Sequence, residues 1–279
     1  MSGLSTLVFV LVALAAGAFF VWNYLQESKR RQALQQFCMA KGWQYTAEDD
    51  SFTVRWNGTP FGQGDRRRCR NVVRGTDRGV PFVAFDYQYD TESTDSRGNT
   101  QRTTHHFDVV ALALPTVLPT LQVTPEGFLE RAAEAVGLGG GIDLESEDFN
   151  RHFRVHARQP KFASDVLTPR TMEALLAGPP TAWRIEMSDL VSWGSGTMNP
   201  VDVLASLSTL HHVVDGIPSF VWHDNGYDPD QQVQSAAPAA PAPSAPPALA
   251  SPAPAPPAPQ AQQAPVAPAA VPPAEGSSA

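Results

Sequence analysis

The sequence predicts an α+β domain, with helices on one face of an antiparallel sheet, between an N-terminal transmembrane helix and a disordered Ala/Pro-rich C-terminal tail. Three observations indicate this: an apolar run at the N-terminus, alternating strand patterns in the first half, and helices that begin at proline in the second half. The expected boundaries are 1–25 for the transmembrane anchor, 26–42 for a helical stalk, 43–230 for the globular domain and 231–279 for the tail.

The run from Leu4 to Trp22 contains no charged residue. A helix of this length extends roughly 28 Å, close to the hydrocarbon thickness of a bilayer. Trp22 and Tyr24 lie at its end, where amphipathic aromatic residues favour the headgroup region. A cleaved signal peptide is the alternative, because Ala16-Gly17-Ala18 resembles a cleavage site. However, no basic residue precedes the run and the run continues past that site, so the pattern favours an anchor.

The charges beside this run predict its orientation. Lys29, Arg30 and Arg31 follow it, whereas only the α-amino group precedes it. The positive-inside rule therefore predicts a single-pass protein of the cell membrane with its domain and tail in the cytoplasm. Good helix formers continue to Ala40, and Gly42 stands where helices commonly end, so a helical stalk should lead into the domain.

The first half of the domain has the pattern of an antiparallel meander. The alternation is clearest in Val80–Tyr89, which is expected to place Phe82 and Ala84 on one face of the sheet. The opposite face of that strand receives Val83, Phe85, Tyr87 and Tyr89. The other predicted strands are Trp43–Thr46, Phe52–Trp56, Cys69–Arg74 and His105–Leu114, with a polar loop over Thr91–Gln101.

Three helices in the second half are predicted to start in the same way. Thr124-Pro125, Thr168-Pro169 and Asn199-Pro200 each place a capping side chain before a proline at the first helical position. Gly137, Gly178 and Gly216 are the expected ends, and Leu204, Leu207, Leu210 and Val214 form a stripe for packing on the sheet. The segments His152–Arg158, Trp183–Met187 and Leu190–Trp193 are predicted as strands between the helices.

Two segments carry a resemblance to a known family. The runs IDLESEDFNRHFRV (142–155) and LTPRTMEALL (167–176) resemble an uncharacterised bacterial family of single-pass membrane-anchored proteins. In that family an LES-x-x-F segment, an F-x-V strand and an LTP helix start recur in this order. The similarity extends loosely over 37–227. It implies a membrane setting, and it implies no activity and no functional residues.

Composition narrows the classes of partner and of redox chemistry. The formal net charge of −8 argues against a general nucleic-acid binder. Cys38 and Cys69 do not make a disulfide framework. Two buried or free thiols are the favoured interpretation, and a disulfide between them is the alternative in an exported domain.

No pattern of catalytic or metal-binding residues stands out. His152 and His156 lie on a predicted strand, roughly 13 Å apart, and the adjacent residues His105 and His106 point to opposite faces of a strand, so neither pair can share one ligand. A third close pair is His211-His212. Cys69 or Ser195 could serve as a nucleophile with one of the histidines, but neither lies in a recognisable motif. The glycine run 137–141 follows a predicted helix, whereas a phosphate loop precedes one. No catalytic, cofactor-binding or metal-ligating residues are predicted, and no cofactor.

The one candidate contact is a cluster of basic residues. Arg66, Arg67, Arg68 and Arg70 could meet anionic lipid headgroups if the domain is held at the inner leaflet, where each basic charge contributes about 1 kcal/mol. The alternative is a solvated turn, paired with the acidic run at 143–148.

Two functional hypotheses follow from this organisation. The favoured one is a membrane-tethered, non-enzymatic binding or scaffolding domain whose partner is a protein or the membrane surface. The alternative is a hydrolase or metal-dependent enzyme whose site is assembled from His, Asp or Cys residues distant in sequence. The tail, in which Glu275 is the only charged residue, is expected to act as a spacer, with docking to a proline-recognising partner as the alternative.

Overall fold

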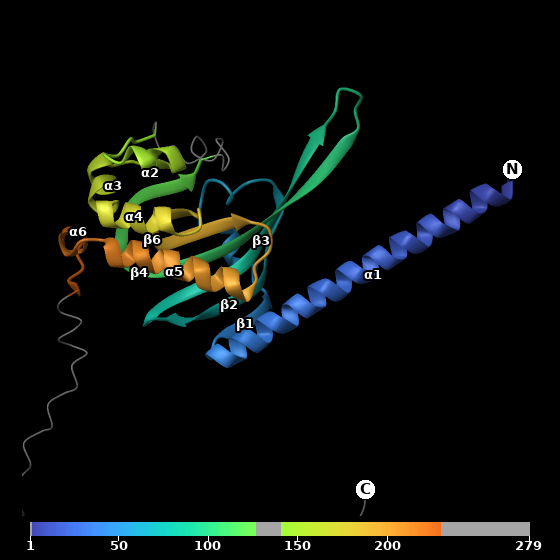
Figure 1. Cartoon of the computed structure of the whole chain (residues 1–279), viewed down its shortest axis with the longest axis horizontal. Coiled ribbons are helices and arrows are strands. Elements are labelled where there is room, and N and C mark those ends of the chain that lie inside the picture. Colours follow the sequence, from blue (N-terminus) through green and yellow to red (C-terminus); the bar gives the residue numbers. More distant parts are fainter. Residues whose placement is uncertain (1, 127–140, 230–279) are drawn as a thin grey trace, which may run out of the picture. The chain divides into compact units, whose positions relative to one another are not determined.

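A computed structural model describes residues 2–126 and 141–229 of the chain (Figure 1). These residues form an α+β fold with one antiparallel sheet and helices, which confirms the predicted class. The predicted tail, 231–279, and the expected helix end at Gly137 lie outside the described residues. In chain order the elements are α1 (Ser2–Lys41), β1 (Gln44–Glu48), η1 (Asp50–Val54), β2 (Asp65–Asp77), β3 (Val80–Thr94), β4 (Thr100–Pro125), α2 (Glu147–His152), β5 (Phe153–Ala157), α3 (Pro160–Val166), α4 (Pro169–Ala177), β6 (Ala182–Ser195), α5 (Pro200–Gly216) and α6 (Ser219–Asp224).

The sheet is built around the long strand β4. The order β1-β2-β3-β4 is antiparallel throughout, as expected for a meander. β6 pairs along the other side of β4, and β5 pairs with the last residues of β4. β3 and β4 continue past the sheet as a two-stranded ribbon that turns at Asp95–Gly98, so the predicted polar loop is mostly paired strand.

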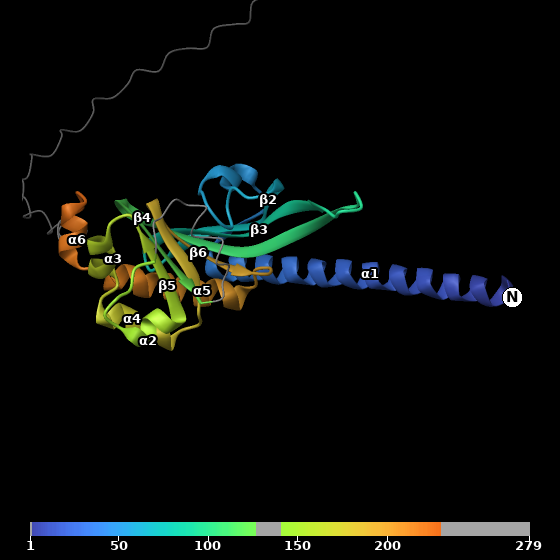
Figure 2. The same cartoon turned by 90° about the horizontal axis from the view of Figure 1, so that it is seen from above.

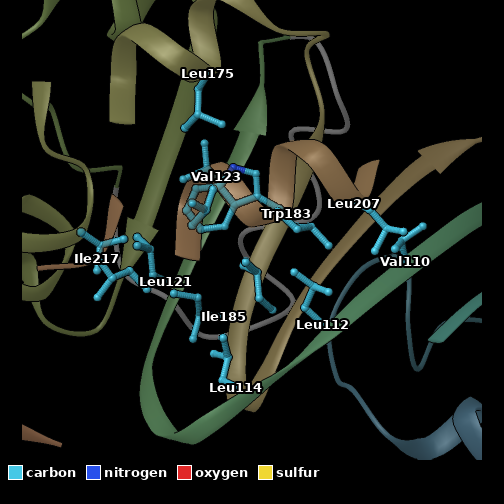
Figure 3. Packing of buried hydrophobic residues seen from close by; sticks show 14 of the residues in the cluster. Val110, Leu112, Leu114, Leu121, Val123, Leu175, Trp183, Ile185, Leu207 and Ile217 are labelled. Carbon is cyan, nitrogen blue, oxygen red and sulfur yellow. The ribbon is translucent and has the colours of Figure 1, made fainter. Parts of the chain in front are cut away.

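Each face of the sheet carries a separate hydrophobic core. Figure 2 shows α1, α4 and α5 on one side of the sheet and the blue segment that contains η1 on the other. The side chains of β3 alternate between the two cores as predicted: Phe82 and Ala84 join the helical side, and Phe85 and Tyr87 join the η1 side. The helical core includes Leu121, Val123, Trp183, Ile185 and Leu207, which converge in Figure 3.

The side opposite the helices is covered by an aromatic cluster. The segment Phe52–Trp56, predicted as a strand, instead lies in and after the short 3-10 helix η1, because the Asp49 side chain caps it by accepting from the Ser51 N–H. The turn lets Phe52, Trp56 and Phe61 stack over Phe85 and Tyr87. The prediction was wrong here because the alternation of apolar and polar residues over five positions does not distinguish a strand from a tight turn that begins and ends with a buried aromatic side chain.

Two of the three proline-started helices are confirmed. Thr168 accepts from the Thr171 N–H at the start of α4, and Asn199 accepts from the Val201 N–H at the start of α5. The third prediction was wrong at its start, because Pro125 is the last residue of β4 and lies opposite Phe153 of β5. A proline is tolerated there because it stands at a strand end, where no further ladder bond is needed.

The remaining elements differ from the sequence predictions in their length. The two short strands predicted around 183–193 are one strand, β6, which passes through Met187 with a φ of 57°. The short helices α2, α3 and α6 were not predicted, and α2 takes in His152. In α5 the buried stripe includes Val203 and Leu207, while Leu204 is 39% exposed.

α1 is one continuous helix, and its second half belongs to the helical core. Leu34 and Cys38 are at most 1% exposed, and Gly42, at a φ of 68°, ends the helix with its N–H bonded to the Met39 carbonyl. The helix therefore runs through the predicted stalk and onto the sheet. Among the described residues, no helix meets the length and apolarity needed to span a bilayer, so the predicted transmembrane segment is not supported by that test.

We expect Leu34→Ala to lower the free energy of unfolding by about 3 kcal/mol, because it removes a fully buried side chain and leaves a cavity between α1 and the sheet. Met39→Ala is the matched control on the same helix, since Met39 is 72% exposed and its loss should cost less than about 0.5 kcal/mol. Urea unfolding followed by tryptophan fluorescence measures both. Equal effects of the two substitutions would mean that α1 is not part of the core.

Candidate functional site

A dense set of polar contacts surrounds Asp86 of β3, on the helical side of the sheet. Its side chain is nearly buried, and three donors from separate elements reach it. Arg30 Nη1 of α1 lies 2.8 Å from Oδ2, and Asn71 Nδ2 of β2 donates at 2.7 Å. The Met198 N–H, just before α5, donates to Oδ1 at 2.6 Å. One carboxylate thus joins α1, β2, β3 and the loop that leads into α5.

Arg30 makes the same junction from the side of α1. Its Nη1 also donates to the Met198 carbonyl at 2.9 Å, and its other nitrogens bind Glu27 one turn earlier. Burial opposes the charge of Arg30, but the Asp86 and Glu27 carboxylates outweigh it and raise the pKa of the guanidinium. The guanidinium of Arg30 therefore keeps its charge at neutral pH.

Asn71 extends the junction to the edge strand β1. It lies at a β-bulge of β2 with a φ of 52°, a left-handed conformation that asparagine tolerates better than most residues. The bulge turns its amide towards Asp86, and its Oδ1 accepts from the Tyr45 hydroxyl at 2.7 Å. Two hydrogen bonds in series thus connect β1 to the same carboxylate.

A second carboxylate, Asp108 of β4, lies opposite Asp86 in the register of the sheet. It accepts from its own backbone N–H, and among the described residues it has no ion-pair partner. Gly194 makes room for it, since a Cβ there would stand 2.6 Å from Asp108 Oδ1. Burial, together with the charges of Asp202 and Asp86, raises the pKa of Asp108. The arrangement can hold a proton on Asp108 beside the ion pair.

The other side of the sheet holds a buried cation, Arg184 of β6. Its guanidinium is 0% exposed, lies 3.0 Å from Glu186 and stacks over Trp193 at 5.3 Å. Burial lowers its pKa. Arg184 also donates to the Asn57 carbonyl, so this cation fixes the segment after η1 on the sheet.

A neighbouring ion pair holds the same segment. Arg55 donates to both oxygens of Asp189, at 2.7 and 2.9 Å, and the Trp56 indole donates to the same carboxylate at 3.0 Å. The Asn57 N–H donates to Glu186 at 3.1 Å. These charged groups are occupied in attaching the aromatic cluster to β6, which gives them a structural role.

The predicted histidine pairs are far from forming one site. His105 stacks on Tyr89 at 4.8 Å, and its neighbour His106 is exposed on β4. His156 of β5 is half-buried, and burial lowers its pKa. His211 of α5 is buried, with Nε2 2.9 Å from Asp77 Oδ2. Within the described ranges no three His, Cys, Asp or Glu side chains are grouped to hold a metal ion.

Among the described residues, neither nucleophile candidate has a hydrogen bond to a histidine. Cys38 and Cys69 are buried free thiols, which confirms the favoured interpretation of the cysteines. Burial, with smaller effects of Asp50 and Asp49, raises the pKa of Cys69 far above its usual range, the opposite of what a nucleophile requires. Ser195 is exposed at the end of β6.

The arginine cluster lies on β2 and not in a turn. Arg66, Arg67 and Arg68 are exposed, and Arg70 is half-buried. Arg68 pairs with Glu48 of β1 at 2.7 Å, whereas the acidic run at 143–148 leads into α2. The structure therefore brings these four residues together along one strand.

Two hollows of the described surface are separate from the Asp86 junction, since none of its residues lines them. One of 360 Å³ lies between α4 and α5, is mainly apolar and includes Leu175 and His212. A larger polar one of 670 Å³ is lined by Glu126, Asp143 and Arg154, among others. The apolar hollow also has Ser208, Thr209 and His212 in its wall. Among the described residues no hydrogen bond joins His212 to either hydroxyl, and Thr209 donates to the Ala205 carbonyl instead.

We expect Arg30→Met to lower the free energy of unfolding by about 2 kcal/mol. The substitution keeps the apolar stem but leaves the Asp86 carboxylate without its cation, and two remaining donors limit the loss below that of a fully orphaned buried charge. Arg31→Met is the matched control, because the Arg31–Glu27 pair is exposed and should contribute less than about 0.5 kcal/mol. Denaturant unfolding at pH 7 distinguishes them, and a smaller loss for Arg30→Met than for Arg31→Met would contradict the junction.

A second prediction concerns Asp108, whose folded-state pKa is raised above its ordinary value of 3.8. The folded chain then binds more protons than the unfolded chain within the window between the two values, so stability falls as the pH rises through it. Asp108→Asn should therefore melt at a higher temperature than the wild type at pH 7, and the difference should narrow as the pH approaches 3.8. Asp215→Asn, at an exposed site, should show no such trend. A pH-independent difference for Asp108→Asn would rule out the raised pKa.

Comparisons with known proteins add no family. No family model matches the chain, and no curated protein matches it. A solved structure that is similar is the crystal structure of the mycobacterial trehalose monomycolate transport factor A, TtfA, at 15% sequence identity and a TM-score of 0.48. The match covers 67% of this chain and 96% of that one. At this level the similarity identifies neither the fold family nor the function of the chain.

Proposed function

We propose that this chain is a membrane-tethered, non-enzymatic binding domain whose anchor helix is built into its fold. The observation that carries the proposal is the continuity of α1. One helix begins with the uncharged segment Leu4–Trp22 and ends in the core at Leu34 and Cys38. No described helix is long and apolar enough to cross a membrane. What supports the tether is the uncharged sequence of Leu4–Trp22 and its place at the start of α1.

The exposed fractions of the side chains along α1 also support a helix whose first half lies outside the core and whose second half lies in it. Leu7, Leu11 and Leu14 are more than half exposed, whereas the face that carries Leu34 is buried. An apolar helix surface of this extent in water is costly, at about 25 cal/mol per Å². A bilayer, or another partner of α1, removes that cost.

A binding function is favoured over catalysis by what the buried charges do. Asp86, Arg184 and Asp189 are each occupied in joining elements of the fold. The proposed partner is the membrane surface or a protein presented near it. In this proposal the domain faces the cytoplasm, as the basic residues after Leu4–Trp22 indicate, and the chain is a member of the bacterial family of membrane-anchored proteins that its motifs resemble.

The tether is tested by extraction of membranes with alkaline carbonate, followed by flotation. The wild-type chain should float with the lipid. The double variant Leu11→Arg/Leu14→Arg should be released, because each arginine at the centre of a membrane helix costs about 3 kcal/mol. The matched control Gln32→Arg/Gln35→Arg adds the same charges to the exposed side of the stalk and should float like the wild type.

Release of the wild-type chain would refute the tether, as would flotation of the double variant. The orientation is measured in intact cells. Single cysteines placed in the tail are treated with an impermeant thiol reagent, and their labelling is followed. The proposed cytoplasmic domain requires labelling only after permeabilisation, and labelling of intact cells would reverse the orientation.

A further inference from the structure

One end of the sheet carries a row of arginines on its outer edge. Arg66, Arg67 and Arg68, here called the arginine edge, occupy the first residues of β2, beyond the point where β1 stops pairing with it at Arg70. All three side chains are exposed. β2 has a bulge between Asp65 and Arg68, and Arg66 within it has a φ of 52°. An arginine in a left-handed conformation is unusual, and the bulge directs side chains away from the regular sheet surface.

The contacts of α1 fix the direction in which this end of the sheet points. Trp43, just after α1, packs on Phe82 at 4.6 Å, and further back along the helix Arg30 contacts Asp86. The end of α1 therefore lies near Phe82. From there the helix runs back towards its first residue on the same side as β3 runs from Phe82 to the ribbon. Figures 1 and 2 both show the first half of α1 and the β3–β4 ribbon extending to the same side.

The arginine edge and the end of the uncharged segment lie at similar distances from the Arg30–Asp86 contact, measured along β3 and along α1. From the Arg30–Asp86 contact, Trp22 is eight helical residues away, about 12 Å. Arg68 pairs with Gln88 and Asp65 with Asp90, which lie about 7 and 13 Å from Asp86 along β3. Arg66 and Arg67 fall between these two levels of β3, at a distance from Asp86 comparable to that of Trp22 from Arg30.

The ribbon keeps this end of the sheet close to the bilayer. Its strands extend to Thr94, about 26 Å beyond Asp86 and therefore past the level of Trp22. The ribbon is polar and exposed, and its open strand edges exclude it from hydrocarbon. With the proposed tether, the ribbon is expected to lie along the headgroups, with the adjacent strand β2 near the same surface.

The charges of the edge are available for a ligand. Arg68 is paired with Glu48, but within the described part of the chain Arg66 and Arg67 have no ion-pair partner. By contrast, the chain as a whole carries a net charge of −8. Two unpaired guanidinium groups at headgroup level match the geometry of lipid phosphates, which arginine binds through parallel hydrogen bonds.

We propose that the arginine edge binds the phosphates of anionic lipid headgroups beside the point where α1 enters the bilayer, and so sets the tilt of the domain. This inference rests on the proposed membrane tether. The alternative was that these arginines pair with the acidic run at 143–148. That run leads into α2, and Arg68 pairs with Glu48 of β1 instead. The bound lipids would be those of the leaflet that faces the domain.

The test uses the full chain in vesicles that contain a trace of spin-labelled phosphatidylglycerol or spin-labelled phosphatidylcholine in a phosphatidylcholine host. The fraction of motionally restricted label reports the preference of the protein for each lipid. We expect the wild type to prefer phosphatidylglycerol several-fold, with the preference reduced at high salt. Arg66→Gln/Arg67→Gln should lower the preference to near one, and Arg66→Lys/Arg67→Lys should keep part of it.

A matched control removes two other exposed arginines, Arg158 and Arg170, which lie after β5 and at the start of α4. Arg158→Gln/Arg170→Gln should keep the wild-type preference. Equal lipid preference of the wild type, or the same loss in both glutamine variants, would overturn the site while carbonate-resistant flotation upholds the tether. Release of the wild type by carbonate would overturn the tether and the lipid site together.

Discussion

The ion pair between Arg30 and Asp86 is the interaction on which the arrangement of this fold depends. It is the polar contact that joins α1 to the sheet from within, at 2.8 Å, and the same carboxylate also orders the loop before α5. A nearly buried carboxylate is costly without partners, so its three donors must all be in place at once. The seating of α1, the bulge at Asn71 and the start of α5 are therefore parts of one polar network.

The two sides of the sheet are covered by different kinds of structure. On the helical side, α1, α4 and α5 cover a core of mixed aliphatic and aromatic side chains. On the other side no α-helix among the described residues covers the sheet; the 3-10 helix η1 and the residues after it do so, with Phe52, Trp56 and Phe61. Such a short segment has little backbone ladder of its own, which is why Arg184 and Asp189 of β6 hold it by hydrogen bonds and ion pairs.

The sequence predicted the elements whose signal is local. Alternation placed β3 with both of its faces, and side-chain caps before proline placed α4 and α5. Pro125 shows the limit of that signal, because the same Thr-Pro pair ends a strand when β5 pairs beside it. The junction was missed although a trace of it is visible, since Asp86 interrupts the apolar side of an alternating strand and Asp108 does so opposite it. A charge on a core-facing position implies a partner, but the identity of Arg30, far away in sequence, depends on tertiary structure.

A helix that is part of the core differs physically from an anchor joined by a linker. A flexible linker lets a domain sample many orientations, with a reach that grows with linker length. Here the proposed membrane segment and buried core residues belong to one helix. The direction of α1 is therefore fixed relative to the sheet. Bending that connection requires breaking helix hydrogen bonds or withdrawing Leu34 and Arg30 from their contacts. In the proposed arrangement the bilayer therefore meets one end of the sheet, and the faces of α4, α5 and α6 are the ones left to a protein partner.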